Sequence, residues 1–282
     1  MLHQKLRVGA LLFLVGVNAF IFFALLHESR GEFLVAFLDI GQGDAIYLRS
    51  PSGRDMLIDG GPDKGVLAAL GTVMPFYDRQ IDVIITTHPD KDHIAGIGDV
   101  MSRYKVSYLL DPLIESDSPY YEAIKKNANN NIVTAIKARR GMEIDLGRGV
   151  RVHIFFPDRD VFGLETNTGS VIARVTYGGT SFLLTGDSPS AIEEYIVSQN
   201  GDALRSTVLK AGHHGSKTSS SPIFVSTVAP QYAVISAGRD NQYGHPHNDV
   251  IEIFKDNSAK VLSTAERGTI RFFSDGSNLR LE

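Results

Sequence analysis

Four side chains of metal-ligating type lie close together in the segment 86–93, which reads TTHPDKDH and directly follows an apolar run typical of a buried strand. Side chains on a strand-to-helix turn can converge because regular structure does not hold them on opposite faces. His88 with Asp90, and Asp92 with His93, would form two nests for two adjacent cations. A surface turn that happens to be rich in histidine and aspartate is the alternative reading.

Three later segments place the same residue types just after expected strands. They contain Asp187, His213, His214, His245 and His247. A carboxylate such as Asp187 at a sheet edge can bridge two cations, although before a helix it could also be an ordinary capping residue. Histidine and aspartate gathered at the ends of several strands are what a polar site on one rim of a layered sheet fold requires.

The spacing of apolar residues and turn signals predicts short strands alternating with helices. Strands are expected at 33–39, 45–49, 55–58, 81–86, 150–155, 171–177, 181–185, 208–210, 232–236, 260–263 and 269–273, and helices at 94–104, 191–200, from 222 onward and at 249–255. Ser188, Ser221 and Asn248 are expected helix caps. The polar stretch 112–145 is expected to be an irregular insertion over the site. This pattern predicts two sheets packed face to face with helices outside, an α/β fold of the αββα four-layer type.

Composition restricts the chemistry of any metal site. The 282 residues include no cysteine, which excludes thiolate ligands, cysteine nucleophiles and disulfides. Metals must therefore be held by imidazole and oxygen ligands, which favours zinc, manganese or iron. The net charge of −4 gives no global basic excess of the kind that coats nucleic acid.

The run Val8–Leu26 is apolar except for Asn18. As a helix it would be about 28 Å long, close to the hydrocarbon thickness of a bilayer. A secretory signal peptide is the alternative, but its apolar stretch is usually roughly 7–15 residues long and ends in a small-residue cleavage site. The end of this run, ALLHE, lacks such a site. We therefore expect a retained transmembrane anchor.

Lys5 and Arg7 precede the run, whereas His27, Glu28 and Arg30 follow it. The positive-inside bias then places the short N-terminus in the cytoplasm and the bulk of the chain outside the cell membrane. The expected organisation is an anchor with a short linker at 1–30 and one larger domain at 31–282.

The motifs together resemble the metallo-β-lactamase superfamily, and within it the domain of the ComEC competence proteins. The resemblance covers roughly residues 33–280. It is carried, in order, by FLDIGQGD at 37–44, LIDGG at 57–61, the 88–93 motif, NTGS at 167–170, LTGD at 184–187, HHGS at 213–216 and YGHPH at 243–247.

The resemblance implies a first metal held by His88 and Asp90 and a second held by Asp92, His93 and His245, with Asp187 bridging. Asp90 and Asn167 stand where the general superfamily pattern has histidines. These oxygen ligands make manganese or magnesium plausible beside zinc. Asn167 or Ser170 could complete the first site or simply order its turn.

The remaining roles are also implied by the resemblance. Of His213 and His214, one would protonate the leaving oxygen or bind phosphate while the other supports a ligand, which makes both catalytic candidates beside Asp92. Lys210 and Ser216 could contact a substrate phosphate, or be a solvated lysine and a turn serine. Asp59 would support a ligating histidine from behind, and His247 would either do the same or cap a helix.

The expected function is hydrolysis of a phosphodiester by a membrane-anchored enzyme with two divalent ions, Zn²⁺ or Mn²⁺, with Mg²⁺ as a further candidate. Single-stranded DNA is the first expected substrate, by analogy with the competence proteins, and no protein partner is predicted. Two alternatives stay open: hydrolysis of phosphorylated cell-surface polymers or lipids, and a non-catalytic metal-binding module. Hydrolysis of β-lactams is disfavoured by the oxygen-rich first site.

Overall fold

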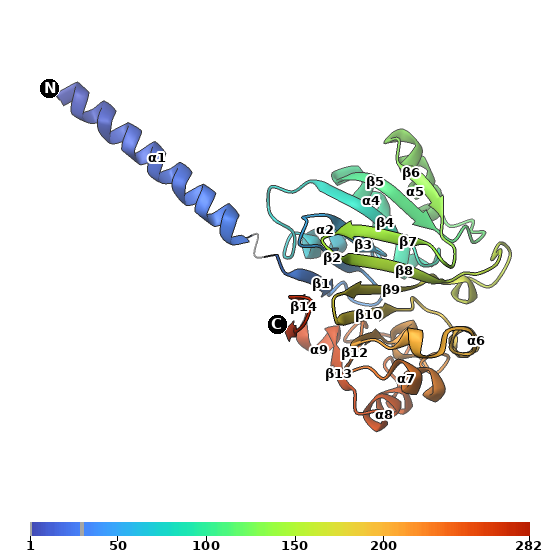
Figure 1. Cartoon of the computed structure of the whole chain (residues 1–282). Helices are drawn as coiled ribbons and strands as arrows, with labels where there is room; N and C mark the ends of the chain where they lie inside the picture. The colour runs from blue at the N-terminus through green and yellow to red at the C-terminus, as the bar shows by residue number, and fades with distance from the viewer. Residues whose placement is uncertain (1, 29–30) are drawn as a thin grey trace.

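The computed structural model describes residues 2–28 and 31–282. Met1, Ser29 and Arg30, which belong to the expected anchor and linker, lie outside the described residues. Helix α1 (Leu2–Glu28) extends away from a layered domain (Figure 1). Its segment Gln4–Phe23 has a mean hydropathy of 2.1 and none of it is buried, so it is long and apolar enough to cross a membrane.

The domain contains two sheets. The eight-stranded sheet has the order β15 (Leu279–Leu281), β14 (Ile270–Ser274), β1 (Phe33–Phe37), β2 (Ile46–Arg49), β3 (Asp55–Ile58), β4 (Gln80–Ile85), β5 (Lys105–Asp111), β6 (Thr134–Lys137). The seven-stranded sheet has the order β13 (Lys260–Ser263), β12 (Tyr232–Ile235), β11 (Val208–Lys210), β10 (Thr180–Leu184), β9 (Ile172–Tyr177), β8 (Val150–Phe156), β7 (Glu143–Gly147).

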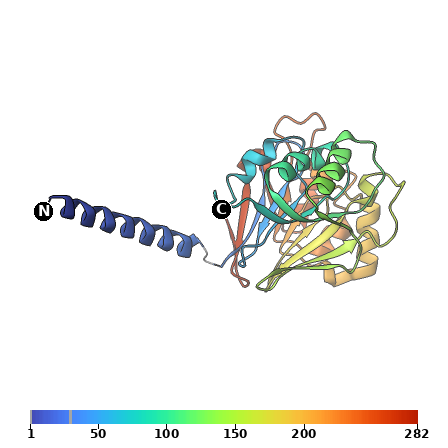
Figure 2. The same cartoon turned by 90° about the horizontal axis from the view of Figure 1, so that it is seen from above.

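Helices cover the outer face of each sheet (Figures 1 and 2). The larger sheet carries α2 (Gly65–Leu70), α3 (Lys91–Ile94), α4 (Ile97–Arg103) and α5 (Pro119–Asn130). The smaller sheet carries α6 (Ser190–Asn200), α7 (Pro222–Val228) and α8 (Asn248–Asp256), while α9 (Thr264–Arg267) follows β13. The 3₁₀ turns are η1 (Asn167–Gly169), η2 (Gly201–Leu204) and η3 (Gly212–Gly215). The expected four-layer αββα fold is confirmed.

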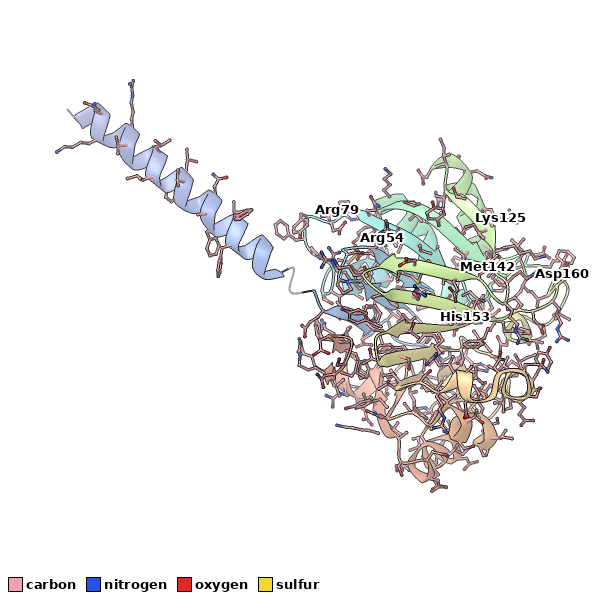
Figure 3. The ribbon with its side chains drawn as sticks, in the orientation of Figure 1. Arg54, Arg79, Lys125, Met142, His153 and Asp160 are labelled. Atoms are coloured by element: carbon pink, nitrogen blue, oxygen red, sulfur yellow. The ribbon has the colours of Figure 1, made fainter. Side chains whose placement is uncertain are left out.

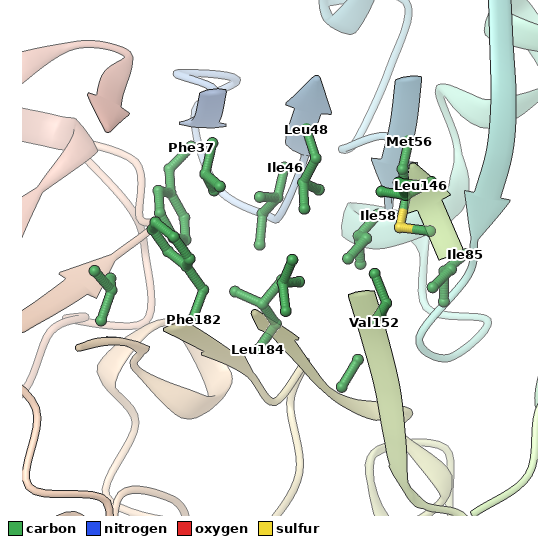
Figure 4. Packing of buried hydrophobic residues seen from close by; sticks show 14 of the residues in the cluster. Phe37, Ile46, Leu48, Met56, Ile58, Ile85, Leu146, Val152, Phe182 and Leu184 are labelled. Atoms are coloured by element: carbon green, nitrogen blue, oxygen red, sulfur yellow. The ribbon is translucent and has the colours of Figure 1, made fainter. Parts of the chain in front are cut away.

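Three buried apolar clusters explain the layers. The central cluster lies between the sheets, where Phe37, Ile46 and Ile58 of one sheet face Phe182 and Leu184 of the other (Figure 4). Alternate residues of the same strands point outward into a second and a third cluster beneath the helices. The strands are therefore buried on both faces, as in β1, where all five residues are buried.

The stretch 112–145 is the main error of the sequence reading. It is not an irregular insertion, because it contains helix α5 and strand β6 and reaches into β7. Tyr121, Ile124 and Ala128 form the buried stripe of α5, and Asn127 and Asn131 donate to carbonyls of the 98–101 segment of α4. The helix is amphipathic, so packing overrides the low helical preference of its asparagines. Strand β5 was also not expected.

The helix caps are corrected too. Helix α6 is preceded by Pro189 rather than Ser188, and α8 is preceded by His247 rather than Asn248. Ser221 does precede α7, but its side chain makes no capping hydrogen bond.

Strand direction gives the sandwich two different rims. Strands β1, β3, β4 and β5 are mutually parallel, and their carboxyl ends meet the ends of β10, β11 and β12 at one rim. We call this the site rim, since it carries 88–93 and Asp187. Strands β1 and β4 begin at the opposite rim, where the chain arrives from α1. We call this the anchor rim.

Candidate metal centre

The turn after β4 places His93 in the interior of the site rim. Its Nδ1 lies 2.8 Å from Oδ2 of Asp59, whose carboxylate also accepts from the backbone N–H and hydroxyl of Thr87 at 2.8 and 2.7 Å. This contact fixes the ring so that Nε2 faces Asp187 Oδ2 at 3.3 Å. Burial disfavours the imidazolium, but Asp187 and Asp59 outweigh it and hold the pKa of His93 well above its ordinary value. Asp59 thus contacts His93 on the side of the ring away from Asp187, and its expected role behind a ligating histidine stays a prediction.

His88 lies against His93, with ring centroids 4.1 Å apart. Its Nδ1 contacts the Thr87 hydroxyl at 3.0 Å, and its Nε2 points toward Asp90 Oδ2 at 3.7 Å. Burial, together with the neighbouring His93, lowers the pKa of His88 well below the ordinary value, so the ring is kept neutral and its lone pair is available. Asp90 is partly exposed, with 40% of its side chain accessible.

The seven-stranded sheet contributes Asp187 and His214. His214 Nε2 lies 3.3 Å from Asp187 Oδ2 and 3.3 Å from Asp92 Oδ2, while its Nδ1 meets the Ser236 carbonyl at 2.9 Å. Burial works against the imidazolium, but Asp187 outweighs it and raises the pKa of His214 to about 9. His214 therefore lies among Asp92, His93 and Asp187, a position that the sequence reading gave to His245.

Lys210 is fully buried at the end of β11. Its ammonium forms an ion pair with Asp44, donates to the Gly186 carbonyl at 3.0 Å and lies 3.6 Å from Asp187 Oδ1. Burial opposes the ammonium, but the two carboxylates outweigh it and raise its pKa. The ammonium has no exposed surface to offer a substrate phosphate, in contrast to the expectation for this residue.

Asp44 reaches this position through a tight glycine loop. A Cβ on Gly43, which has φ of +124°, would lie 2.1 Å from the Asp92 carbonyl oxygen. The backbone N–H of Asp44 donates to that same oxygen at 3.2 Å. Only glycine permits so close an approach, and it seats Asp44 beside the 88–93 turn.

The turn after β11 is strained and held by hydroxyls. His213 and His214 both have left-handed backbone angles, with φ of 45° and 56°. His213 Nδ1 lies 3.1 Å from the Thr218 hydroxyl, which in turn lies 3.0 Å from the Ser216 hydroxyl. Ser216 is buried, so it orients Thr218 and His213 rather than facing solvent.

His245 borders this turn. Its ring lies 5.6 Å from that of His213 and 6.3 Å from that of His214, measured between centroids. His247 N–H donates to the Gly215 carbonyl at 3.0 Å, which joins the 245–247 segment to the histidine turn. His247 therefore precedes α8 and supports the turn through its backbone.

The segment before β9 borders the other side of the site. The Val171 N–H donates to the Thr87 carbonyl at 3.0 Å, which places 167–171 beside the start of the metal motif. Asn167 Oδ1 and Ser170 Oγ are buried and make no hydrogen bond within the described part of the chain. Both candidates for completing the first site thus have a side-chain oxygen without a hydrogen bond, in a segment that contacts Thr87.

Unpaired buried atoms test whether this centre suits a metal. Among the described residues, five such atoms are His88 Nε2, His93 Nε2, His214 Nε2, His245 Nδ1 and Asp187 Oδ1. Ligand atoms of Asp44, His93, Asp187 and His214 also lie within 4.8 Å of one another. Buried polar atoms without partners are costly, and imidazole with carboxylate is a donor set for divalent cations. The residues fit a metal centre.

Comparison with known proteins agrees with this chemistry. The profile of the metallo-beta-lactamase superfamily matches residues 38–239. The chain belongs to this superfamily.

This superfamily member is similar to the competence protein ComA of Neisseria gonorrhoeae, with 41% identity over 109 residues that cover 39% of the chain and 16% of that relative. Over nearly the whole chain it is 31% identical to ComE operon protein 3 of Bacillus subtilis, across 288 residues that cover 96% of the chain and 36% of the relative. It is also 31% identical over 274 residues to Recombination protein 2 of Haemophilus influenzae, covering 95% and 33%. The chain therefore spans about a third of the length of these last two relatives.

Solved structures support the superfamily fold. The metallo-beta-lactamase fold protein YhfI from Bacillus subtilis matches with a TM-score of 0.59 and 14% identity, covering 86% of this chain and 100% of that one. Zn²⁺-bound PqqB from Methylobacterium extorquens matches with a TM-score of 0.53 and 13% identity, covering 79% and 85%. At this identity the likeness concerns the fold alone.

Replacing Asp59 by asparagine is expected to weaken metal binding by this superfamily member about 10–100-fold, the usual cost of removing a partner behind a ligating histidine. The amide cannot hold His93 Nδ1–H as the carboxylate does, so the ring loses its fixed orientation. Competition with a chromophoric chelator measures the affinity. Asp63→Asn, in the loop before α2, is the control, and equal affinities of both variants would contradict the role of Asp59.

Glu193 was not expected, yet it supports the histidine turn from α6. Its buried carboxylate accepts from the backbone N–H groups of Ser220 and Ser221, at 2.8 Å each. A Cβ on Gly212 would lie 3.1 Å from Glu193 Oε1, so the carboxylate also packs against the start of the turn. Burial raises the pKa of Glu193 to about 7 in spite of both hydrogen bonds.

This raised pKa predicts a pH-dependent stability. The folded chain binds the Glu193 proton more tightly than the unfolded chain, so the stabilisation is full below pH 4.5 and is lost as pH rises through 7. Relative to Glu193→Gln, the wild-type free energy of unfolding should fall by about 3 kcal/mol across that range. Denaturant unfolding at several pH values measures it. Glu194→Gln, at the exposed neighbouring position, should follow the wild type, and a Glu193→Gln variant that also follows it would refute the assignment.

Proposed function

We propose that this chain is a metal-dependent phosphodiesterase that acts on single-stranded DNA. The observation that carries the proposal is the group of buried imidazole and carboxylate atoms at the site rim that make no hydrogen bond within the described residues, in a chain similar to a competence protein. Two adjacent ligand nests suit displacement at phosphorus, because attacking and leaving oxygens each need a positive partner.

We assign the ligands by proximity. His88 and Asp90 would hold a first ion, with Asn167 or Ser170 beside it, and Asp187 would bridge. Asp92, His93 and His214 would hold the second ion, with His245 at its border. A pair of divalent ions there supplies Lewis acidity and makes water nucleophilic near neutral pH.

Side chains around the proposed ligands would orient the ligands and the reacting groups. Asp59 holds the His93 ring, and Lys210 holds Asp187 and Asp44 by charge. His213 is the partly exposed histidine, with 28% of its side chain accessible and its Nε2 3.7 Å from Asp187 Oδ2. Its Nε2 is in position to hold the proton that the departing oxygen needs, while the Thr218 hydroxyl orients its Nδ1.

We also propose that residues 1–30 form a membrane anchor with a short linker and that 31–282 form the hydrolase domain, outside the cell. Only three Cα steps join Glu28 to Gly31, at most about 11 Å. Strand β4, which separates the two rims, has six residues and is about 20 Å long. The tether is thus too short for the domain to invert, with the site rim against the anchoring bilayer and the anchor rim about 20 Å above it. This favours a soluble polymer over lipids of that membrane as substrate.

The test incubates the detergent-purified full chain with labelled single-stranded DNA and Mn²⁺. We expect cleavage that Asp92→Ala abolishes, because Asp92 contacts His214 in the second nest. Cleavage that persists in Asp92→Ala would refute the site. Two metals per chain without DNA cleavage would point to phosphorylated surface polymers, and one metal or none would point to a binding module.

A further inference from the structure

We propose that the loop carrying Phe76 and Tyr77 inserts into the headgroup region of the bilayer that holds α1, as a second contact between domain and membrane. The inference rests on the proposed membrane anchor. It concerns the anchor rim, and none of the residues it uses belongs to the metal centre.

The loop presents aromatic surface to solvent. Phe76 is 84% exposed and Tyr77 is 50% exposed. Their rings pack edge to face, with centroids 5.4 Å apart and planes at 82°. Together they form a rigid aromatic pair, the side-chain type that membrane proteins concentrate at the bilayer–water interface.

The loop lies where the chain arrives from the membrane. A cavity of about 550 Å³ is lined on one side by Gly31 and Glu32, and on the other by Met74, Pro75 and Tyr77. The loop directly precedes β4, so it belongs to the anchor rim. Figures 1 and 2 both show α1 leaving the domain from this side.

The short connection between α1 and Gly31 limits how far the anchor rim can lie from the bilayer. Because three Cα steps separate Glu28 from Gly31, the point where the chain enters this rim stays within about 11 Å of the end of α1. Exposed aromatic side chains on this rim are therefore closer to the lipid headgroups than to a soluble partner. Lipid is therefore the occupant that the covalent structure favours over a protein partner.

Arg79 adds a positive charge to the anchor rim beside this loop. It lies on the side of the domain that faces α1 (Figure 3), is exposed, and donates to the Asp78 carbonyl at 2.8 Å. Among the ion pairs of the described residues, none joins Arg79 to a carboxylate. A guanidinium beside an aromatic pair matches the phosphate layer of a bilayer.

The test uses a chain that has no native tryptophan. Phe76→Trp gives a single reporter at the loop, and the full chain is reconstituted into phosphatidylcholine vesicles whose acyl chains are brominated near the glycerol or near the methyl end. We expect blue-shifted emission that is lost in brominated vesicles, more with shallow than with deep bromine. Phe76 is exposed, so the substitution should not disturb folding.

Two matched variants make the result decisive. Phe162→Trp reports another exposed phenylalanine, 62% accessible, beside Asp160 on the far side of the domain (Figure 3), and its emission should not change. Phe13→Trp reports α1 itself and should be quenched by deep bromine. Quenching of Phe13→Trp without quenching of Phe76→Trp overturns this inference and leaves the anchor standing. No quenching of Phe13→Trp overturns the anchor and this inference together.

Discussion

Replacing Asp187 by asparagine is expected to abolish hydrolysis and to strip metal from the purified chain. The Asp187 carboxylate lies 3.3 Å from both His93 Nε2 and His214 Nε2, two residues assigned to the second ion, and we propose that it also bridges to the first. Mutation of a residue that supports a metal ligand lowers affinity or activity about 10–100-fold, and mutation of a bridging ligand should lower them more. The initial rate on single-stranded DNA and the metal content by mass spectrometry measure both effects.

The matched control is Asp202→Asn in η2, whose side chain is 87% exposed and pairs with Arg205. That variant should keep full activity and full metal content. If Asp187→Asn folds, retains two metals and hydrolyses DNA at the wild-type rate, the ligand assignment is wrong. Circular dichroism separates this outcome from simple unfolding.

Replacing Lys210 by methionine is expected to destabilise the fold by about 3–5 kcal/mol, the cost of removing one partner of a buried ion pair. Methionine fills the volume but leaves the Asp44 and Asp187 carboxylates facing each other without the ammonium. For a domain of this size that loss corresponds to roughly 6–20 °C in the thermal midpoint. Thermal unfolding in the presence of a chelator measures it, since a bound cation would otherwise offset part of the lost charge.

Two comparisons isolate the charge effect. Lys217→Met, at an exposed position in the same loop, should shift the midpoint little. Adding Asp44→Asn to Lys210→Met removes one uncompensated carboxylate and should restore part of the stability. An unchanged midpoint in Lys210→Met would show that this buried pair contributes nothing to folding.

The strands were predictable because each carries its own signal. Strands β3, β11 and β13 have the bounds expected from sequence, since apolar β-branched runs end there at clear turn residues. Helix α5 was missed because its composition is polar. Local helical signals are present, since Ser118 and Pro119 stand at its start and Tyr121, Ile124 and Ala128 have helical spacing.

The site was predictable where ligands are adjacent in sequence. The 88–93 motif and Asp187 do meet, as their positions after strands indicated. The Asp44–Lys210 pair was not predicted, because the two residues are far apart in the chain and a lysine before two histidines reads as solvent-exposed or phosphate-binding. The choice between His214 and His245 likewise depended on the left-handed turn, which sequence spacing does not specify.

The proposed metal ligands come from both sheets, and this has a mechanical consequence. His88, Asp92 and His93 follow a strand of the larger sheet, whereas Asp187 and His214 follow strands of the smaller one. At the anchor rim the two sheets are joined by contacts within the protein, such as the hydrogen bond that the Gly179 N–H donates to the Gly276 carbonyl at 2.6 Å. Bound cations would therefore cross-link the two sheets at the site rim. Removal of the cations by a chelator should let the sheets separate at the site rim while the anchor rim stays joined.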